Sequence, residues 1–282
     1  MTAFGVQGSS PLVDGPPDPD HYRRIAEAAE AAGFDSLWAS DHVAFHHPLL
    51  DVTVALATFA AVTERIKLGA GVLLLPLRAP ALVAREFASL DYLSGGRVIL
   101  GVGVGGEHPA DFEAVGVPVR ERGARTNASM RALRELFPRQ APPPVQAGGP
   151  PLWVGGRSEA AIRRAAELGD GWFPLWVSPD RYAEGLAQLG PGKTAALVVP
   201  ALVDGTTEEA RVYLSRRYGT EFSTHAIERY CAVGSRAQCA ERIAEYVAAG
   251  AEHVVFHPTV EPARLEEQTE RLAEVVGVAA AR

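Results

Sequence analysis

The stretch IKLGAGVLLLPLRAPALVAREFASLDYLSGGRVILGVG, residues 66–103, decides the fold. It opens with a β-rich run over residues 66–75, and Pro76 and Pro80 mark the turn that follows. Residues 81–93 then form a predicted helix, and residues 97–103 form a second predicted strand. A strand, a helix and another strand in this order predict a unit of a parallel α/β sheet.

The same alternation continues on both sides of this unit. We predict strands at 4–7, 36–40, 66–75, 97–103, 152–155, 170–174, 195–202 and 253–257. We predict helices at 20–32, 51–63, 81–93, 122–137, 158–168, 179–189, 207–217, 235–249 and 262–276. Eight strand–helix repeats in 282 residues favour an α/β fold of the (β/α)8 TIM-barrel type over an open doubly wound sheet. We expect one domain over residues 1–282, with an insertion before the last helix–strand unit.

The composition argues against several classes of protein. A hydrophobic fraction of 47% with 22% charged residues is ordinary for a soluble enzyme. The net charge of −7, without a basic block, argues against nucleic acid or a membrane surface as the partner. Cys231 and Cys239 give neither a disulfide framework nor a zinc cluster, and we expect no metal. With no leader-like start and no run of about 18 apolar residues, a cytoplasmic enzyme acting on a small molecule is the expectation.

A glycine motif raises a second possibility. Gly101, Gly103 and Gly106 fit the dinucleotide-binding pattern G-x-G-x-x-G. That pattern belongs to the first strand-to-helix turn of a chain, whereas several predicted strands precede this one and Pro109 follows closely. In a barrel, glycines at strand ends instead let a flat ligand lie against the backbone, and the pair at 155–156 before a capped helix offers amides to a phosphate. The pattern therefore predicts a flavin-type cofactor, with Gly103 beside its ring.

Four stretches together resemble the luciferase-like monooxygenase superfamily of flavin- or deazaflavin-dependent barrel oxidoreductases. They are residues 29–43 (AEAAGFDSLWASDHV), 56–105 (LATFAAVTERIKLGAGVLLLPLRAPALVAREFASLDYLSGGRVILGVGVG), 154–174 (VGGRSEAAIRRAAELGDGWFP) and 233–258 (VGSRAQCAERIAEYVAAGAEHVVFHP). The resemblance implies a bulge in the third strand, often with a non-prolyl cis peptide, at Gly71 and Val72, against which the cofactor ring leans. It also implies that family members often dimerise, so a homodimer is expected.

The resemblance further implies a phosphate site after the fifth and sixth strands. Carried over to this chain, its residues are Gly155, Gly156, Arg157 and Ser158, with Gly171 and Trp172 beside them. The family divides between users of the deazaflavin coenzyme F420 and users of FMN. Residues 40–42, Ser-Asp-His, look more like the deazaflavin branch, so F420 is the expected cofactor and FMN the alternative.

Three residues are candidate catalytic groups. His42 follows the second predicted strand, and a histidine with a pKa near neutral suits proton transfer. Asp41 could set the tautomer of His42 or cap the next segment, and Glu107 is a candidate acid or base. His257, after the last predicted strand, could face the pocket or the rim. For His46, His47 and His108, a solvated position in a loop is as plausible as a position in the site.

The expected activity is hydride transfer between F420 and a small to mid-sized organic substrate. An FMN-dependent monooxygenase that uses molecular oxygen is the first alternative, and a non-catalytic cofactor-binding barrel is the second. Loops 107–121 and 219–234 would form a lid that sets specificity. Their side chains Phe112, Phe222 and Tyr230 suggest a partly apolar substrate.

Overall fold

The computed structural model describes residues 1–9, 18 and 20–277, and within them the strands form one parallel sheet. The strands are β1 (Ala3–Gln7), β2 (Ser36–Ala39), β3 (Lys67–Leu74), β4 (Val98–Gly103), β5 (Leu152–Gly155), β6 (Gly171–Phe173), β7 (Thr194–Val203), β8 (Ala232–Gly234) and β9 (His253–Pro258). Each predicted strand is present, and no end differs from the prediction by more than one residue.

The sheet closes into a barrel. β1 pairs with β2 on one side and with β9 on the other, while β6 pairs with β7. Eight strands therefore follow one another around a ring in the order β1-β2-β3-β4-β5-β6-β7-β9. Within the described part of the chain, β8 pairs only with the last residues of β7 and is not part of the ring. The predicted TIM barrel is confirmed.

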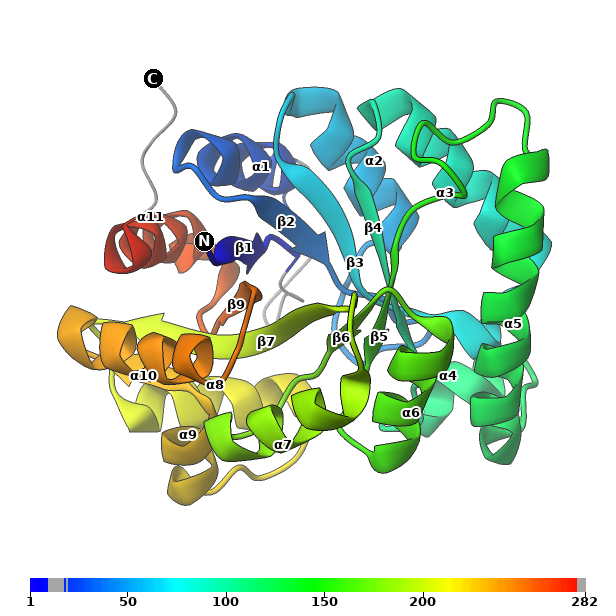
Figure 1. Ribbon diagram of the computed structural model, residues 1–282. Helices are drawn as coiled ribbons and strands as arrows, with labels where there is room; N and C mark the ends of the chain where they lie inside the picture. The colour runs from blue at the N-terminus through cyan, green and yellow to red at the C-terminus, as the bar shows by residue number, and fades with distance from the viewer. Residues whose placement is uncertain (10–17, 19, 278–282) are drawn as a thin grey trace.

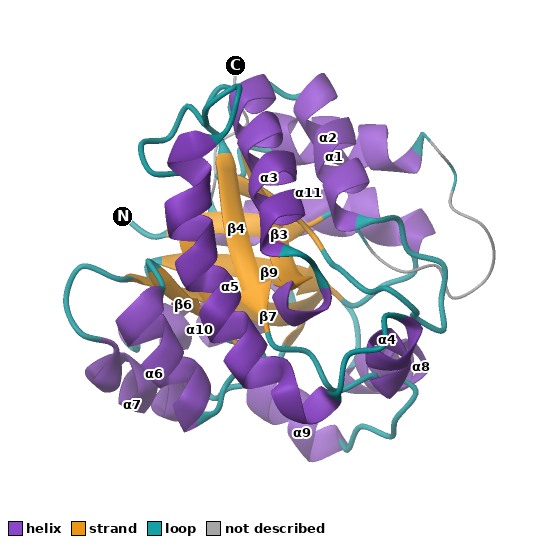
Figure 2. Cartoon of the chain, turned by 90° about the vertical axis from the view of Figure 1, so that its right-hand side faces the viewer, coloured by secondary structure: helices purple, strands orange, loops and turns teal. Residues whose placement is uncertain are grey.

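Helices surround the strands on all sides (Figure 1), and the turned view shows the strands inside this layer (Figure 2). The helices are α1 (His21–Ala31), α2 (Val52–Val62), α3 (Pro80–Ser94), α4 (Pro109–Ala114), α5 (Arg122–Leu136), α6 (Glu159–Leu168), α7 (Pro179–Leu189), α8 (Thr207–Tyr218), α9 (Thr224–Tyr230), α10 (Arg236–Ala248) and α11 (Leu265–Val276). Among the described residues, no helix is long and apolar enough to cross a membrane.

Several helices begin at a residue whose side chain caps them. Asp51 caps α2 by accepting the Thr53 amide at 2.9 Å, and Ser158 caps α6 by accepting the Ala161 amide at 3.2 Å. The predicted N-cap at Ser158 is thus confirmed. α8 begins with a full capping box between Thr206 and Glu209. These caps fix the strand-to-helix turns on which the site is built.

Two short α-helices and one short strand were not predicted. α4 lies in the 107–121 loop, and α9 and β8 lie in the 219–234 insertion before the last helix–strand unit. They contain 6, 7 and 3 residues. Such lengths span less than about two helical turns, so no hydrophobic period can develop in the sequence.

An aromatic layer fills the inside of the barrel below the site. Trp38 stacks on Phe173 with ring centroids 4.5 Å apart and on Trp153 at 5.4 Å. Beneath them, the Ser36 hydroxyl lies 2.7 Å from Nε2 of His253 and accepts the indole N–H of Trp38 at 2.7 Å. This packed layer fills the barrel interior, and ligands of such barrels bind at the carboxyl ends of the strands.

Candidate active site

A cavity of about 230 Å³ lies at the carboxyl ends of the strands. Its lining brings together nine of the twelve predicted site residues, namely Asp41, His42, Gly71, Val72, Gly103, Glu107, Gly155, Gly156 and Arg157. Ser158, Gly171 and Trp172 do not line it. The cavity is therefore the candidate active site.

The third strand forms one wall of this cavity. The Gly71–Val72 peptide is cis, and the pairing of β3 with β4 shifts register between Ala70 and Leu73. The expected bulge with a non-prolyl cis peptide is confirmed at the expected residues. The carbonyl of Gly71 accepts the side-chain amide of Gln7 at 3.3 Å.

The glycines of β4 leave room for this bulge. A Cβ atom on Gly101 would lie 2.1 Å from the carbonyl oxygen of Ala70, and one on Gly103 would lie 2.4 Å from the Val72 side chain. Both distances are far shorter than any non-bonded contact. The glycines that resemble a dinucleotide motif therefore accommodate the neighbouring strand, and Gly103 exposes its backbone to the cavity beside Val72.

His42 is held by a residue that the sequence analysis missed. Its Nδ1 donates to Oδ2 of Asp111 at 2.8 Å, and Oδ1 of Asp111 accepts the amides of Val43 and Ala44 at 2.7 and 2.8 Å. The His42 ring also stacks on Phe45, with ring centroids 4.1 Å apart. Burial lowers the pKa of His42 below its ordinary value, while Asp111 opposes that shift. With Nδ1 occupied by Asp111, Nε2 is the nitrogen left for a ligand in the cavity.

Asp111 reaches His42 from α4, in the loop between β4 and α5. Burial acts to raise its pKa, but the hydrogen bonds from Ala44, His42 and Val43 outweigh burial and keep that pKa below its ordinary value. Its signal in the sequence was the Pro109-Ala110-Asp111 run, in which a proline and then an acidic residue are typical of the first turn of a helix.

Asp41 has neither of its predicted roles. Its Oδ2 accepts the Leu74 amide at 2.9 Å, and its Oδ1 accepts the Arg78 guanidinium at 2.7 Å. It thus fixes the end of β3, whereas His42 takes its orientation from Asp111 and α2 takes its cap from Asp51. Burial raises the pKa of Asp41, and Arg78 acts against that rise. The expectation for Asp41 was wrong because the following strand turn, rather than its sequence neighbour, uses its carboxylate.

The turn after β5 forms the opposite edge of this wall. Gly156 has a φ of +97°, a left-handed conformation that favours glycine, and its carbonyl accepts the indole N–H of Trp172 at 2.9 Å. Trp172 itself packs outward on Tyr182 of α7, with ring centroids 5.4 Å apart. It supports the turn from behind, and Gly171 lies beside it where a Cβ atom would meet the Thr194 carbonyl at 2.8 Å.

Glu107 and Arg157 stand at the mouth of the cavity. Their charged atoms are 3.8 Å apart, and their side chains are 69% and 53% exposed. A carboxylate this exposed is surrounded by water, so its ion pair with Arg157 contributes little to stability. His46 and His108 also gather at the mouth, around Phe45, at centroid distances of 4.4 and 4.9 Å from its ring.

Two segments contribute lining residues that sequence reasoning did not single out. Trp176 comes from the turn after β6, and Arg217 and Tyr218 come from the last turn of α8. His257, for which pocket and rim were both open, lines the cavity from the end of β9. Phe222 packs on Trp176 at a centroid distance of 5.0 Å, so loop 219–234 contacts a lining residue, but none of its own residues lines the cavity. Phe112, by contrast, does not line the cavity, because its side chain is buried against Leu74 and Leu77.

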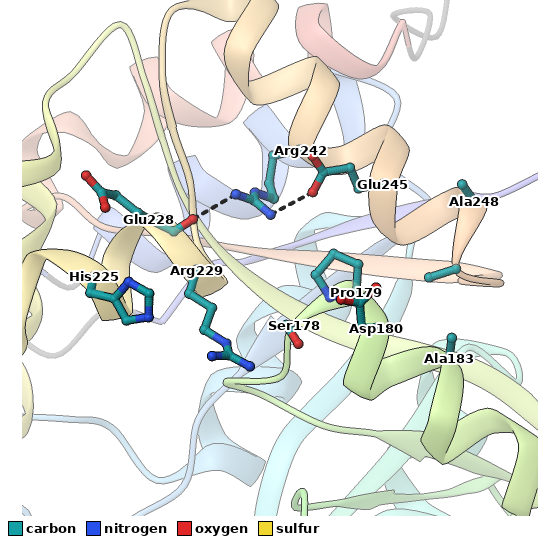
Figure 3. Close-up of a pocket in the computed structure, with 11 residues that line it drawn as sticks. Ser178, Pro179, Asp180, Ala183, His225, Glu228, Arg229, Arg242, Glu245 and Ala248 are labelled. Carbon is teal, nitrogen blue, oxygen red and sulfur yellow. Dashed lines mark hydrogen bonds and ion pairs between the residues drawn. The ribbon is translucent and has the colours of Figure 1, made fainter.

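A larger hollow of about 900 Å³ lies on the outside of the barrel, between α7, α9 and α10 (Figure 3). Its central Arg242 donates to Glu245 at 2.6 Å and to the Glu228 carbonyl at 2.7 Å. It contains none of the predicted site residues and lies away from the strand ends. Among the residues the structure describes, no cluster of His, Cys, Asp and Glu could hold a metal ion.

Comparison with known proteins agrees with this architecture. An uncharacterised protein of Mycobacterium tuberculosis is 32% identical over 226 residues, which cover 66% of this chain and 78% of the relative. An F420-dependent secondary alcohol dehydrogenase, solved with an F420–acetone adduct, superposes with a TM-score of 0.80 at 18% identity over 98% of both chains. A Pseudomonas putida type II Baeyer–Villiger monooxygenase in complex with FMN superposes with a TM-score of 0.74 at 16% identity over 98% of both chains.

At these identities the two solved structures show the fold alone. The luciferase-like monooxygenase family itself matches residues 1–211, about three quarters of the sequence. The chain belongs to the luciferase-like monooxygenase family and is an oxidoreductase.

Proposed function

We propose that this oxidoreductase transfers hydride between coenzyme F420 and a small to mid-sized organic substrate. One observation carries the proposal: His42, oriented by Asp111, lines a cavity whose other wall is bare backbone of β3, β4 and β5. Hydride transfer to a carbonyl, or from an alcohol, also moves a proton at the substrate oxygen. A histidine with one fixed and one available nitrogen suits that proton.

The residues present fit a flat ring that ends in a phosphate. Val72, Gly103 and Gly155 offer a wall without long side chains, and a Cβ atom on Gly155 would come within 3.0 Å of Val72. The turn at Gly156 and Arg157 leads into α6, whose N-terminal amides and dipole favour an anion. We assign the ring to the first set and the phosphate to the second. When bound, F420 supplies a hydride donor or acceptor.

The remaining roles belong to side chains of this chain. Asp111 keeps the proton of the His42 imidazole on Nδ1, so that Nε2 accepts a proton from a substrate hydroxyl or returns it to a carbonyl oxygen. Phe45 stacks on the imidazole and fixes its plane. Trp176, packed on Phe222, covers the cavity and limits the access of water to that proton.

The F420-dependent alcohol dehydrogenase supports this proposal, because it has the same fold and its ligand is formed from F420 and acetone. FMN is the second candidate cofactor. The family is described as monooxygenases, and the Pseudomonas putida enzyme has the same fold with FMN bound. The bare wall and the phosphate turn suit either ring system.

The test is a titration of cofactor-free protein with F420 and with FMN, in which binding is monitored by fluorescence. We expect F420 to bind at least tenfold more tightly than FMN. The F420 complex is then mixed with secondary alcohols, and bleaching of F420 absorbance without oxygen uptake reports hydride transfer. Tighter binding of FMN, with substrate-dependent oxygen uptake, would instead establish the monooxygenase alternative. Binding of neither cofactor would overturn both.

A further inference from the structure

Two buried side chains of the cavity have hydrogen-bonding atoms without partners. Arg217 is 5% exposed, and its Nε and Nη1 make no hydrogen bond to the described part of the chain. His257 is 1% exposed, and neither of its ring nitrogens has a partner there. The guanidinium of Arg217 lies over the ring of Tyr218, with its Cζ 5.6 Å from the ring centroid. Both side chains line the same cavity as His42.

A buried guanidinium whose N–H groups lack hydrogen-bond acceptors destabilises the folded protein. Arginine does not lose its proton in proteins, so the charge persists when water is removed. Buried charges in folded proteins are normally matched by an anion or a network of acceptors. Across residues 20–277 the ion pairs of the structure give Arg217 no carboxylate partner. The donors of Arg217 therefore suit an acceptor that arrives with a ligand.

The position of the pair separates it from the proposed cofactor wall. His257 lies on β9, which is four strands from β4 in either direction around the ring. It thus lies across the barrel from the Gly103 end of β4, and Arg217 joins it from the last turn of α8. Arg217, His42 and His257 all line this one cavity, so the guanidinium lies at the same end of the barrel as both rings.

The charge balance selects one class of ligand. Burial, reinforced by Arg217, holds the pKa of His257 well below its ordinary value, so its ring is neutral at pH 7 and offers one donor and one acceptor. The pair therefore carries a single positive charge. A carboxylate matches that charge, whereas a doubly charged phosphate would leave one negative charge uncompensated.

We propose that Arg217 and His257 form a subsite for a carboxylate group on the organic substrate. The inference rests on the proposed function, because it orients the substrate with its carboxylate at α8 and β9 and its reacting carbon toward His42. It adds a substrate class, a hydroxy or oxo acid, to the reaction.

The test uses benzoate and benzamide as probes, because they share size and shape but differ in charge. Their affinities for the full-length, cofactor-free protein are measured by calorimetry in a buffer without carboxylates. The variant is Arg217→Met, and the matched control is Arg157→Met, which removes the guanidinium at the opposite wall of the cavity. F420 is titrated into the same three proteins.

We expect wild type to bind benzoate at least tenfold more tightly than benzamide, and Arg217→Met to lose this preference while Arg157→Met keeps it. We also expect Arg217→Met to keep or raise Tm, since it removes an unpaired buried charge. Equal binding of the two probes to wild type, or a preference that survives in Arg217→Met, would overturn the subsite. Loss of F420 binding in Arg217→Met with no effect in Arg157→Met would assign the guanidinium to the cofactor instead. If F420 does not bind at all but benzoate preference depends on Arg217, the cofactor assignment fails and the subsite stands.

Discussion

Replacing Asp111 by asparagine should change the tautomer of His42 while the imidazole itself stays in the cavity. The asparagine oxygen can still accept the Val43 and Ala44 amides, which now lie 2.7 and 2.8 Å from Oδ1. Its NH2 group then faces Nδ1 of His42 in place of the carboxylate oxygen at 2.8 Å. An N–H donor at that position favours the tautomer with the proton on Nε2, which can no longer accept a proton from the substrate.

The size of the effect follows from the contact that is lost. A positioned general base contributes roughly 10²- to 10⁴-fold, so kcat for alcohol oxidation should fall by about 10²-fold or more. Asp111 raises the pKa of His42, against the larger lowering by burial. Removing the carboxylate leaves the lowering by burial without its main opposing contact, so the acid limb of kcat/KM should move to lower pH.

The assay is F420 reduction with a reactive alcohol, followed from pH 4.5 to 9 in wild type and in Asp111→Asn. Glu113→Gln is the matched control, because it removes a carboxylate from an exposed position of the same helix. A kcat within twofold of wild type, together with an unmoved acid limb, would show that Asp111 does not orient a catalytic His42. A parallel loss in Glu113→Gln would point to α4 as a whole.

Three further predictions follow from single residues. His42→Ala should bind F420 within a few-fold of wild type but lose about two orders of magnitude in kcat; weaker F420 binding with normal kcat at saturation would remove His42 from catalysis. Gly156→Leu should weaken F420 binding at least tenfold, about 1.4 kcal/mol, because φ is +97° at this position. The control is Gly190→Leu, at the C-terminal end of α7, where φ is +83°. This control should leave F420 binding unchanged in the same titration. Burial lowers the pKa of His253 to about 4, so between pH 6.5 and 4 this histidine is protonated in the unfolded chain and neutral in the native state. Urea denaturation should therefore show that the free energy of unfolding falls by about 3 kcal/mol as pH falls from 6.5 to 4. His253→Gln should have a shallower pH dependence, and an equal slope would contradict the buried neutral ring.

The barrel could be predicted because its long elements carry their own signals. α3 has 15 residues with a proline at its start and a left-handed glycine at its end, and β3, before it, is an apolar run after its first residue, Lys67. Residues on both faces of such strands are buried, so the sequence is apolar throughout. The same reasoning placed His42, because a polar residue directly after a predicted strand lies at the catalytic end of a barrel.

Asp111 and Arg217 could not be placed in this way. Asp111 is 69 residues from His42 in the sequence, and it comes from a helix of only 6 residues. Arg217 lies in the last turn of α8, where a basic residue is normally explained by the helix dipole. In both cases the function depends on where a loop returns across the barrel end, which no local pattern records.

The glycines of β4 show why a correct motif can have the wrong cause. Gly101 and Gly103 must lack a side chain, as a phosphate-binding turn would require, but the atoms that exclude a Cβ belong to Ala70 and Val72 of the neighbouring strand. That requirement arises from the bulge in β3. The bulge shifts the pairing of β3 with β4 by one residue and directs the Val72 side chain toward β4 and β5. A single sequence presents the two causes identically, because it shows that the side chain is missing and not which atoms take its space. The distinction becomes visible when two strands are placed side by side, and here it turns an expected ligand contact into the support of the wall that a ligand would use.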